Sequence, residues 1–526
     1  MTDDPGTTAP VLQLQGITKR FGQLVANNDI SLKLHAGEVL ALLGENGAGK
    51  STLMSILFGH YRADAGHITL HGQALPPGNP AAALAAGIGM VHQHFTLADN
   101  LSVLDNVILG TEPLWQAWSA RAKARARLLE VGQRFGLSVQ PEARVGQLSV
   151  GERQRVEILK ALYRGARILI LDEPTAVLTP QESEALFDTL GQLVREGLSV
   201  IFISHKLGEV LRVSHRVAVL RGGRLVAEAP AAGTSQAQLA QWMVGHAVSA
   251  PERRPAGATG PVTCELYSVS TPAGQRERLS EVNLQLRAGE IVAIAGVSGN
   301  GQLALAELLC GSRRATQGEV LLKGQPLQAS PAWLVNQGVA RIPEDRHAVG
   351  VIGDLPVWEN AVSERLRDPV FSRWGWVRRS LARQHAQRVI EAFDVRGAGA
   401  LSPARALSGG NMQKLILGRA LLPLPGRPIG QAPSLIVAHQ PTWGLDIGAV
   451  AYVQQQLLAA RDAGAAVLLI SDDLDEVLAL GDRIAVMHHG HLSPALPALQ
   501  WSRESIGLAM AGGPVTAEAA EASLTP

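Results

Sequence analysis

The chain contains the same succession of segments twice, and this internal repeat constrains its fold more than any other feature. The segment Ala36–Gly49 (AGEVLALLGENGAG) returns as Ala288–Gly301 (AGEIVAIAGVSGNG), and Leu148–Leu162 returns as Leu407–Leu421. A chain of 526 residues also exceeds what one hydrophobic core usually supports. We therefore expect two homologous domains, a linker between them and a disordered tail: residues 11–246, 262–511, 247–261 and 512–526.

Each half alternates short apolar runs with amphipathic helical patterns. The runs VLALLG, ILILD and SVIFIS are typical of strands buried in a parallel sheet, whereas STLMSILFG and ERQRVEILKAL are typical of helices. This alternation predicts the α/β class for both domains. The linker AVSAPERRPAGATGP, if flexible, spans only about 20–25 Å, so the two domains are tethered closely enough to dock on each other.

Composition excludes several classes of function. Lys and Arg number 47 against 46 Asp and Glu, a net charge of +1, so no nucleic-acid partner is indicated. The two cysteines, Cys264 and Cys310, are too few for a disulfide scaffold, a four-cysteine zinc site or a four-thiolate iron–sulfur cluster. No apolar run approaches the roughly 18–20 residues that span a bilayer, and the start, MTDDPGTT, does not resemble a signal peptide. We therefore expect a soluble or peripheral protein.

A phosphate-binding motif lies in the first half. The octapeptide GENGAGKS matches G-x-x-x-x-G-K-[ST] between a predicted strand and a predicted helix, the context that the motif requires. Its glycines let backbone N–H groups face phosphate oxygens, and the helix N-terminus adds positive potential. Lys50 is expected to reach the β- and γ-phosphates, and Ser51 to give its hydroxyl to Mg²⁺. The predicted nucleotide-binding positions here are Gly44, Glu45, Asn46, Gly47, Ala48, Gly49, Lys50, Ser51 and Thr52.

Two acidic residues end another apolar strand of the same half. The run ILILDE places Asp172 and Glu173 at the carboxyl end of a predicted parallel strand, the edge that faces ligands in such sheets. Beside a phosphate loop, Asp172 is expected to hold Mg²⁺ through water, and Glu173 to polarise the attacking water as general base. Alone, the pair would be interpreted as solvated acids at a strand end.

Three further residues of the first half are ambiguous by themselves. His205 follows the predicted strand Ser199–Ser204, but a lone histidine is more often structural. Gln93, in VHQHF, has no distinctive context of its own. Phe21 precedes the phosphate loop and suits stacking on adenine, with core packing as an alternative of nearly equal weight.

The segments LSVGE (Leu148–Glu152) and LSGGNMQ (Leu407–Gln413) each open a predicted helix, and with the motifs above they resemble ATP-binding cassette ATPases over nearly the whole chain. The resemblance implies two tandem nucleotide-binding domains, each with a mixed sheet and a helical subdomain. They pair head to tail, so that ATP lies between the phosphate loop of one and the signature segment of the other. The resemblance also implies roles for the three ambiguous residues. Gln93 would lie near Mg²⁺ and the membrane partner, His205 would be the switch histidine that contacts the γ-phosphate, and Phe21 would stack on adenine. From the second half it adds the ATP contacts Ser408, Gly409, Gly410, Gln413 and Asp446.

Departures from the family pattern gather on one of the two composite sites. The second phosphate loop has Gln302 and Leu303 in place of the lysine and serine, and His439-Gln440 in place of the acidic pair. The other departures at that site are Ala273, Glu344, Asp472, Val150 and Thr179. The site that joins Lys50 to Ser408 keeps every expected group. This segregation supports head-to-tail pairing and one hydrolytic site per chain. Its predicted catalytic residues are Glu173, His205 and Lys50, and its predicted Mg²⁺ ligands are Ser51, Gln93 and Asp172.

The resemblance also narrows the class of cassette protein. Iron–sulfur recycling and excision-repair cassettes need cysteine ligands that this chain lacks, and translation-type cassettes usually carry two active sites and a long charged linker helix. What remains resembles the ATPase of a bacterial importer of simple sugars or nucleosides. Such an ATPase serves two integral permease subunits, and through them a substrate-binding lipoprotein, at the cytoplasmic face of the inner membrane. The strings VHQHF, RVEILKALYRGA and QPTWGLD favour nucleosides, with monosaccharides as the alternative and a translation-type ATPase as a distant one.

Three tryptophans have no firm assignment. Trp443 stands where the family usually has arginine, and no physical reason accounts for it. Trp374 and Trp376 lie among arginines in the stretch Trp358–Arg379. This stretch belongs either to a surface that docks a permease or to a solvated basic helix with partly buried tryptophans.

Overall fold

The computed structural model divides the chain into two compact units, residues 1–248 and 249–526. The described residues are 9–92, 95–111, 120–175, 178, 180–204, 206–245, 259–272, 277–397, 399–425 and 433–513. Most of the predicted linker and tail lie outside these residues, as do Gln93, Thr179, His205 and Ala273. None of the helices in the described part of the chain is long and apolar enough to cross a bilayer.

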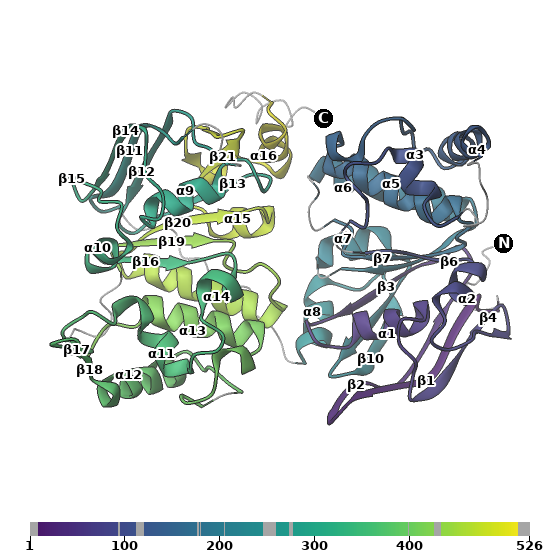
Figure 1. Ribbon diagram of the computed structural model, residues 1–526, viewed down its shortest axis with the longest axis horizontal. Helices are drawn as coiled ribbons and strands as arrows, with labels where there is room; N and C mark the ends of the chain where they lie inside the picture. Colours follow the sequence, from purple (N-terminus) through teal and green to yellow (C-terminus); the bar gives the residue numbers. More distant parts are fainter. Residues whose placement is uncertain are drawn as a thin grey trace. The chain divides into compact units, whose positions relative to one another are not determined.

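The first unit contains an antiparallel sheet and a largely parallel sheet (Figure 1). The antiparallel sheet has the order β2-β1-β4-β5, with β1 Leu12–Phe21, β2 Leu24–Leu34, β4 Ala65–Leu70 and β5 Gln73–Ala74. The second sheet has the order β10-β9-β3-β8-β7-β6, with β3 Val39–Gly44, β6 Ile88–Val91, β7 Ile168–Asp172, β8 Ser199–Ile203, β9 Arg216–Arg221 and β10 Arg224–Pro230. Its inner strands β3 and β8 are buried along their whole length, which is why their sequences are continuous apolar runs.

Helices surround these sheets and complete the core of the first unit. They are α1 Lys50–Phe58, α2 Pro80–Ala85, α3 Val103–Ile108, α4 Arg121–Arg134, the 3₁₀ turn η1 Val145–Gln147, α5 Val150–Tyr163, α6 Pro180–Arg195, α7 Leu207–Val213 and α8 Gln236–Val244. Leu53, Met54 and Leu57 of α1 pack in one apolar cluster with residues of both sheets, so α1 joins the two layers. Helices α3, α4 and α5 contact one another, and α5 also contacts β6.

The second unit repeats this arrangement. Its antiparallel sheet has the order β12-β11-β14-β15, with β11 Val262–Ser270, β12 Val282–Arg287, β14 Gln317–Leu322 and β15 Gln325–Pro326. The larger sheet has the order β16-β19-β20-β13-β21-β22, with β13 Ile291–Ala295, β16 Val339–Ile342, β19 Leu435–His439, β20 Ala466–Ser471, β21 Arg483–His488, β22 His491–Leu492 and, beside β21, β23 Leu496–Pro497. The order of the parallel strands matches that of the first unit, which confirms the α/β fold expected for both repeats.

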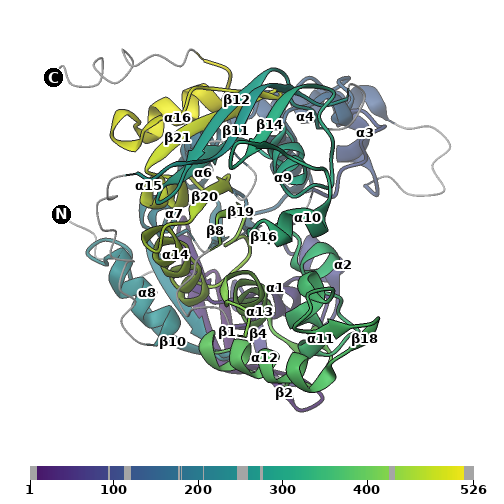
Figure 2. The same cartoon turned by 90° about the vertical axis from the view of Figure 1, so that its left-hand side faces the viewer.

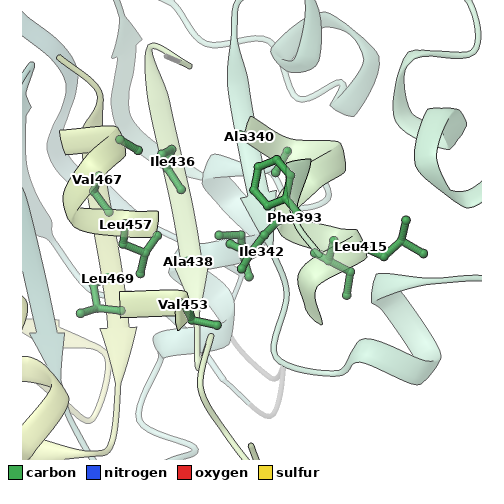
Figure 3. Packing of buried hydrophobic residues seen from close by; sticks show 14 of the residues in the cluster. Ala340, Ile342, Phe393, Leu415, Ile436, Ala438, Val453, Leu457, Val467 and Leu469 are labelled. Atoms are coloured by element: carbon green, nitrogen blue, oxygen red, sulfur yellow. The ribbon is translucent and has the colours of Figure 1, made fainter. Parts of the chain in front are cut away.

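The helices of the second unit follow the same plan. They are α9 Gln302–Leu309, α10 Pro331–Asn336, α11 Val357–Val362, α12 Arg379–Ala392, α13 Gly409–Leu421, α14 Ile447–Asp462, α15 Leu474–Leu480 and α16 Arg503–Met510, with short turns η2 Arg346–Gly350, η3 Ser363–Arg365, η4 Ala404–Ala406 and η5 Ala498–Gln500. A small hairpin of β17 Ser372–Arg373 and β18 Trp376–Val377 lies between η3 and α12 in the sequence. Side chains of α14 such as Val453 and Leu457 pack with β19 and β20 residues such as Ile436 and Leu469 (Figure 3).

Candidate nucleotide-binding sites

The first phosphate loop joins β3 to α1, and its outer side fits closely against neighbouring backbone. Helix α1 begins at Lys50 after Gly49, whose φ of 100° lies in the left-handed region. A Cβ at Gly49 would lie 2.3 Å from the carbonyl oxygen of Ala26, so only glycine fits there. The buried Asn27 side chain donates from Nδ2 to the carbonyl oxygen of Gly49 at 3.0 Å. Ala26 and Asn27 of β2 therefore fix the position of the loop. The loop leads into the N-terminus of α1, and helix N-termini bind anions well.

Lys50 lies buried against the loop that precedes it. Its Nζ donates to the carbonyl oxygens of Gly44 at 2.7 Å and Glu45 at 3.0 Å. Burial lowers the pKa of Lys50, and the carboxylates of Glu173, Asp172 and Glu45 partly offset this by favouring the charged ammonium. Ser51 is the next residue of α1 and is exposed. The loop thus places one cation and one hydroxyl at the start of the helix.

The two predicted acids lie at the carboxyl end of β7, close enough to Lys50 to interact with it electrostatically. Strand β8 separates β7 from the loop strand β3. Burial raises the pKa of Asp172, Glu173 raises it further, and Lys50 and His92 oppose this shift. Glu173 adopts a left-handed φ of 48°, and its N–H donates to the carbonyl oxygen of Ile203 at 2.9 Å. The structure therefore brings Lys50, Asp172 and Glu173 together although more than 120 residues separate the two motifs in the sequence.

The aromatic ring of Phe21 lies at the end of β1 and is not a core residue. Its side chain is 43% exposed, which removes the core-packing alternative. The ring makes an edge contact with Tyr61 at 5.5 Å between centroids, and the ammonium of Lys19 lies 5.5 Å from it. An exposed ring with an aromatic neighbour offers a face for a planar base. The roles predicted for Gln93 and His205 fall on positions outside the described residues.

The second phosphate loop also joins a strand, β13, to a helix, α9, and one of its own side chains forms hydrogen bonds with its backbone. Helix α9 begins after Gly301, which has a left-handed φ of 119° like its counterpart in the first loop. The buried Gln302 accepts a hydrogen bond at Oε1 from the Asn300 N–H at 2.9 Å and donates from Nε2 to the Val297 carbonyl at 2.8 Å. Its amide therefore uses both a donor and an acceptor of the loop that holds it.

A carboxylate also occupies the start of α9. The N–H of Leu303, at the position of Ser51 in the first loop, donates to Oε2 of Glu277 at 3.0 Å. Arg313 donates to the carbonyl oxygen of Glu277 at 2.9 Å and so holds the segment that carries this carboxylate. Helix N-termini favour negative groups, so Glu277 takes the place that a phosphate would take.

The residues at the ends of the strands beside the second loop include two acids, Glu344 and Asp472, and a histidine, His439. The carboxyl of Glu344 has a raised pKa because of burial, then because of Asp472, Glu277 and Asp345. His439, which ends β19, lies 3.6 Å from Glu344, and burial lowers the pKa of His439 to about 4, so this imidazole is neutral at physiological pH. A triphosphate there would meet Glu277 and these acids, with Gln302 at the position where the first loop has the Lys50 ammonium.

The two signature segments differ at the start of their helices. Ser149 caps α5 with a capping box to Glu152, and the N–H of Gly151 donates to Glu182 at 3.2 Å. In the second unit Ser408 caps α13, and a Cβ at Gly410 would lie 3.7 Å from Oδ2 of Asp446, which itself caps α14. The second signature therefore gathers a serine, two glycines (Gly409 and Gly410) and an aspartate at adjoining helix N-termini.

Gln413 is positioned differently from the other predicted contacts of this segment. It is 1% exposed, and its Nε2 donates to the carbonyl oxygen of Pro441 at 2.8 Å. In this structure its side chain therefore connects α13 to the segment that precedes Asp446. Its contact with ATP stays a prediction.

Sequence reasoning did not identify three residues that shape these sites. Asn27 and Tyr61 have no motif of their own, and only the fold places them beside Gly49 and Phe21. Glu277 could have been found from the sequence. The internal repeat aligns it with Val25, so a charged residue replaces an apolar one at this position of the second repeat.

Comparisons with known proteins agree with this geometry. A family profile described as "ABC transporter" matches residues 27–176 and again residues 279–425. "Glucose import ATP-binding protein TsgD13" of Haloferax volcanii is 43% identical, covering 96% of this chain and 96% of the relative. "Nucleoside import ATP-binding protein NupA" of Lactococcus lactis subsp. cremoris is 41% identical, covering 96% of this chain and 98% of the relative. A solved structure of the archaeal ribosome recycling factor aABCE1, in complex with the archaeal ribosomal stalk protein aP1, matches this chain with a TM-score of 0.59. The match covers 93% of this chain and 92% of that chain at 18% sequence identity. An identity this low shows a shared fold alone.

Proposed function

The chain belongs to the ABC transporter family, and on that premise we propose that it is the ATP-hydrolysing subunit of a bacterial importer for nucleosides. The observation that carries the ATPase activity is the buried Lys50 of the first phosphate loop, whose ammonium interacts electrostatically with Asp172 and Glu173. The importer assignment rests on near full-length similarity to two proteins named as import ATP-binding proteins. The translation-type alternative has only a shared fold in its favour.

The first unit supplies the groups that bind and polarise the triphosphate. Backbone N–H groups of the loop and the Lys50 ammonium neutralise phosphate oxygens, and Phe21 stacks on adenine. The donor set fits Mg²⁺, because Ser51 offers a hydroxyl at the start of α1 and Asp172 a carboxylate at the end of β7, and oxygen ligands suit this cation. Gln93 is the third proposed ligand. Bound Mg²⁺ would add neutralising charge on the phosphate oxygens.

Glu173 and His205 are the proposed groups that act on the reacting atoms. Glu173 accepts a hydrogen bond from the attacking water and polarises it as general base. It directly follows β7, and its left-handed φ of 48° recurs at Gln440, the corresponding residue of the second unit. His205 contacts the γ-phosphate and stabilises the charge that develops there.

The second unit completes this site in our proposal. N–H groups and side chains at the starts of α13 and α14, from Ser408, Gly409, Gly410 and Asp446, contact the γ-phosphate across a head-to-tail pairing of the two cassettes. Two adjoining helix N-termini suit this role because both direct positive potential outward. The pairing is supported by the segregation of the family residues onto one composite site.

The second phosphate loop takes no part in turnover in our proposal. Its Gln302 and Glu277 side chains use loop groups that a phosphate would need. It also has Leu303 in place of a Mg²⁺-binding hydroxyl, and His439 and Gln440 in place of the acidic pair. One ATP is therefore hydrolysed per chain in each cycle.

The proposed partners are two integral permease subunits, which contact the chain at the cytoplasmic face of the membrane and connect it to a substrate-binding lipoprotein. In the second unit a groove of about 570 Å³ lies between α10, β16, η2 and η3. Arg341 and Arg419 pair with Glu364 on its wall at 2.7 and 3.2 Å, and the exposed Val349 and Ile352 line it. The groove has apolar and charged lining residues, and Glu344 follows its wall strand β16 in the sequence. Such a groove suits a short permease helix.

Two cargo classes remain, and each has an observation in its favour. The strings VHQHF, RVEILKALYRGA and QPTWGLD and the 41% identity to a nucleoside import protein favour nucleosides. The 43% identity to a glucose import protein favours monosaccharides. Uptake of labelled purine nucleosides should fall in a strain that lacks this gene, whereas uptake of glucose, ribose, xylose and galactose should not. Loss of sugar uptake alone would assign the monosaccharide cargo instead.

The peripheral location is tested by purification from membranes. The chain should co-purify with two integral subunits in mild detergent. Recovery with ribosomes, and without integral subunits, would overturn the importer assignment.

A further inference from the structure

The hairpin of β17 and β18 lies beside α11 and α12 in the second unit (Figures 1 and 2). Its strands pair Ser372 with Val377 and Arg373 with Trp376. The fully buried Phe371 anchors its base, with its ring 5.3 Å from that of His385 in α12. A hairpin with only two residue pairs is not stable alone, so this anchor holds it in place.

The tip of the hairpin presents two indole rings to solvent. Trp374 is 89% exposed and Trp376 is 81% exposed. Trp374 has a φ of 56° and Gly375 a φ of 79°, the left-handed pair of a type I′ turn, in which Asn and Gly are favoured. A tryptophan in this conformation costs backbone energy, and at this exposure neither indole repays the cost by packing in the core.

The stretch of sequence that contains the hairpin is rich in arginine and has no acidic residue of its own. Between Asp368 and Glu391 the sequence has no acidic residue, and it has five arginines: Arg373, Arg378, Arg379, Arg383 and Arg388. Arg373 and Arg379 are exposed on either side of the indoles. The whole chain has a net charge of only +1, so this concentration is local. We call the surface formed by residues 373–379 the Trp–Arg surface.

We propose that the Trp–Arg surface contacts a membrane that contains anionic lipid. Indole rings prefer the interface between headgroups and acyl chains, and a cluster of arginines is attracted to anionic headgroups and pairs with their phosphates. The hairpin lies at the edge of the second unit (Figures 1 and 2), and the groove beside α10 is lined by other residues. An exposed pair of indoles enters a fluid lipid layer without a matching pocket, whereas a protein partner would have to supply one. This contact goes beyond the proposed import activity, since it requires neither permease nor ATP.

The test is co-sedimentation of the purified full-length chain with vesicles. Vesicles of phosphatidylcholine are compared with vesicles of phosphatidylcholine and phosphatidylglycerol at 3:1. The chain should bind the anionic vesicles, and added salt should weaken this binding. One arginine near an anionic surface changes the partition coefficient about fivefold, so Arg378→Gln with Arg379→Gln should lower it about 25-fold.

A second variant tests the indoles while preserving the turn. Trp374→Asn places a residue favoured in the left-handed conformation, and Trp376→Thr keeps a good strand residue. This double variant should lose vesicle binding while its thermal melt stays unchanged. Matched controls are Leu499→Ala, at a fully exposed apolar residue, and Arg396→Gln, at an exposed arginine, and both should bind like the unchanged chain.

Three results would overturn the proposal. The unchanged chain could fail to bind anionic vesicles, or bind neutral vesicles equally well. The tryptophan variant could keep full vesicle binding but lose co-purification with permeases in detergent, which would assign the surface to a protein partner. Because the vesicle assay contains no permease, nucleotide or cargo, its failure leaves the import proposal standing, and failure of import leaves the lipid contact standing.

Discussion

Introducing residues of the first repeat at three positions in and beside the second phosphate loop should create a second nucleotide-binding site. The substitutions are Glu277→Val, Gln302→Lys and Leu303→Ser, each of which introduces the residue found at the corresponding position of the first repeat. The unchanged chain should bind one ATP, and the triple variant two. The reason is that Gln302 and Glu277 use loop groups that would otherwise contact phosphate.

The size of the effect follows from the position of the Glu277 carboxylate. It accepts the Leu303 N–H at 3.0 Å, so a phosphate oxygen near that N–H would lie beside it. At about 4 Å and an effective dielectric constant of about 20, two like charges repel by about 4 kcal/mol, or about a thousandfold in affinity. Gln302→Lys alone leaves this repulsion in place, so we expect the single variant to bind little nucleotide at the second loop.

The measurement is equilibrium dialysis of labelled ATP against the full-length chain. All proteins carry Glu173→Gln, which removes the proposed general base and so keeps ATP intact at the first site. The matched control is Glu281→Gln, an exposed acid four residues from Glu277, which should leave the stoichiometry at one. A stoichiometry of two for the chain with native second-loop residues would refute the reasoning. The triple variant should still hydrolyse no ATP at the second loop, because His439 and Gln440 remain and groups that act as a unit are not additive.

Four other changes give sharp expectations. Lys50→Ala removes the cation of the only intact phosphate loop and should lower the ATPase rate of the assembled transporter by about 10²–10⁴-fold or more; retention of half the rate would show that the second site is catalytic. Glu173→Gln should lower the rate about as much while trapping ATP in a closed state, which is read as occluded nucleotide after gel filtration. Ser408→Arg should damage turnover as severely as either, and an unaffected rate would contradict the composite site. Burial raises the pKa of Glu476 to about 7, so its contribution to stability is present below about pH 4.5 and is lost as the pH rises through 7. Glu476→Gln should therefore stabilise the second unit by about 2–3 kcal/mol in denaturant titrations at pH 8 and by much less at pH 4.5.

The sequence determined the parts of this protein whose physics is local or repeated. The phosphate loop is one continuous segment whose glycines and lysine act through neighbouring backbone, so GENGAGKS identified it without a structure. The strand ILILD and the acids after it were predictable because buried parallel strands are continuous apolar runs whose carboxyl ends face ligands. The internal repeat then assigned the α/β fold to both halves, and the departures from family residues predicted that the second site is degenerate.

Only the tertiary structure decided which distant side chains meet. It placed Phe21 in solvent beside Tyr61, and it committed the Gln413 amide to the Pro441 carbonyl. It also showed that Glu277 fills the start of α9, which the substitution of a lysine by Gln302 does not imply. The indoles of the Trp–Arg surface were visible in the sequence, but periodicity could not distinguish a partly buried helix from an exposed turn. Such outcomes depend on packing between segments far apart in the chain, and a pattern in one segment carries no information about what packs against it.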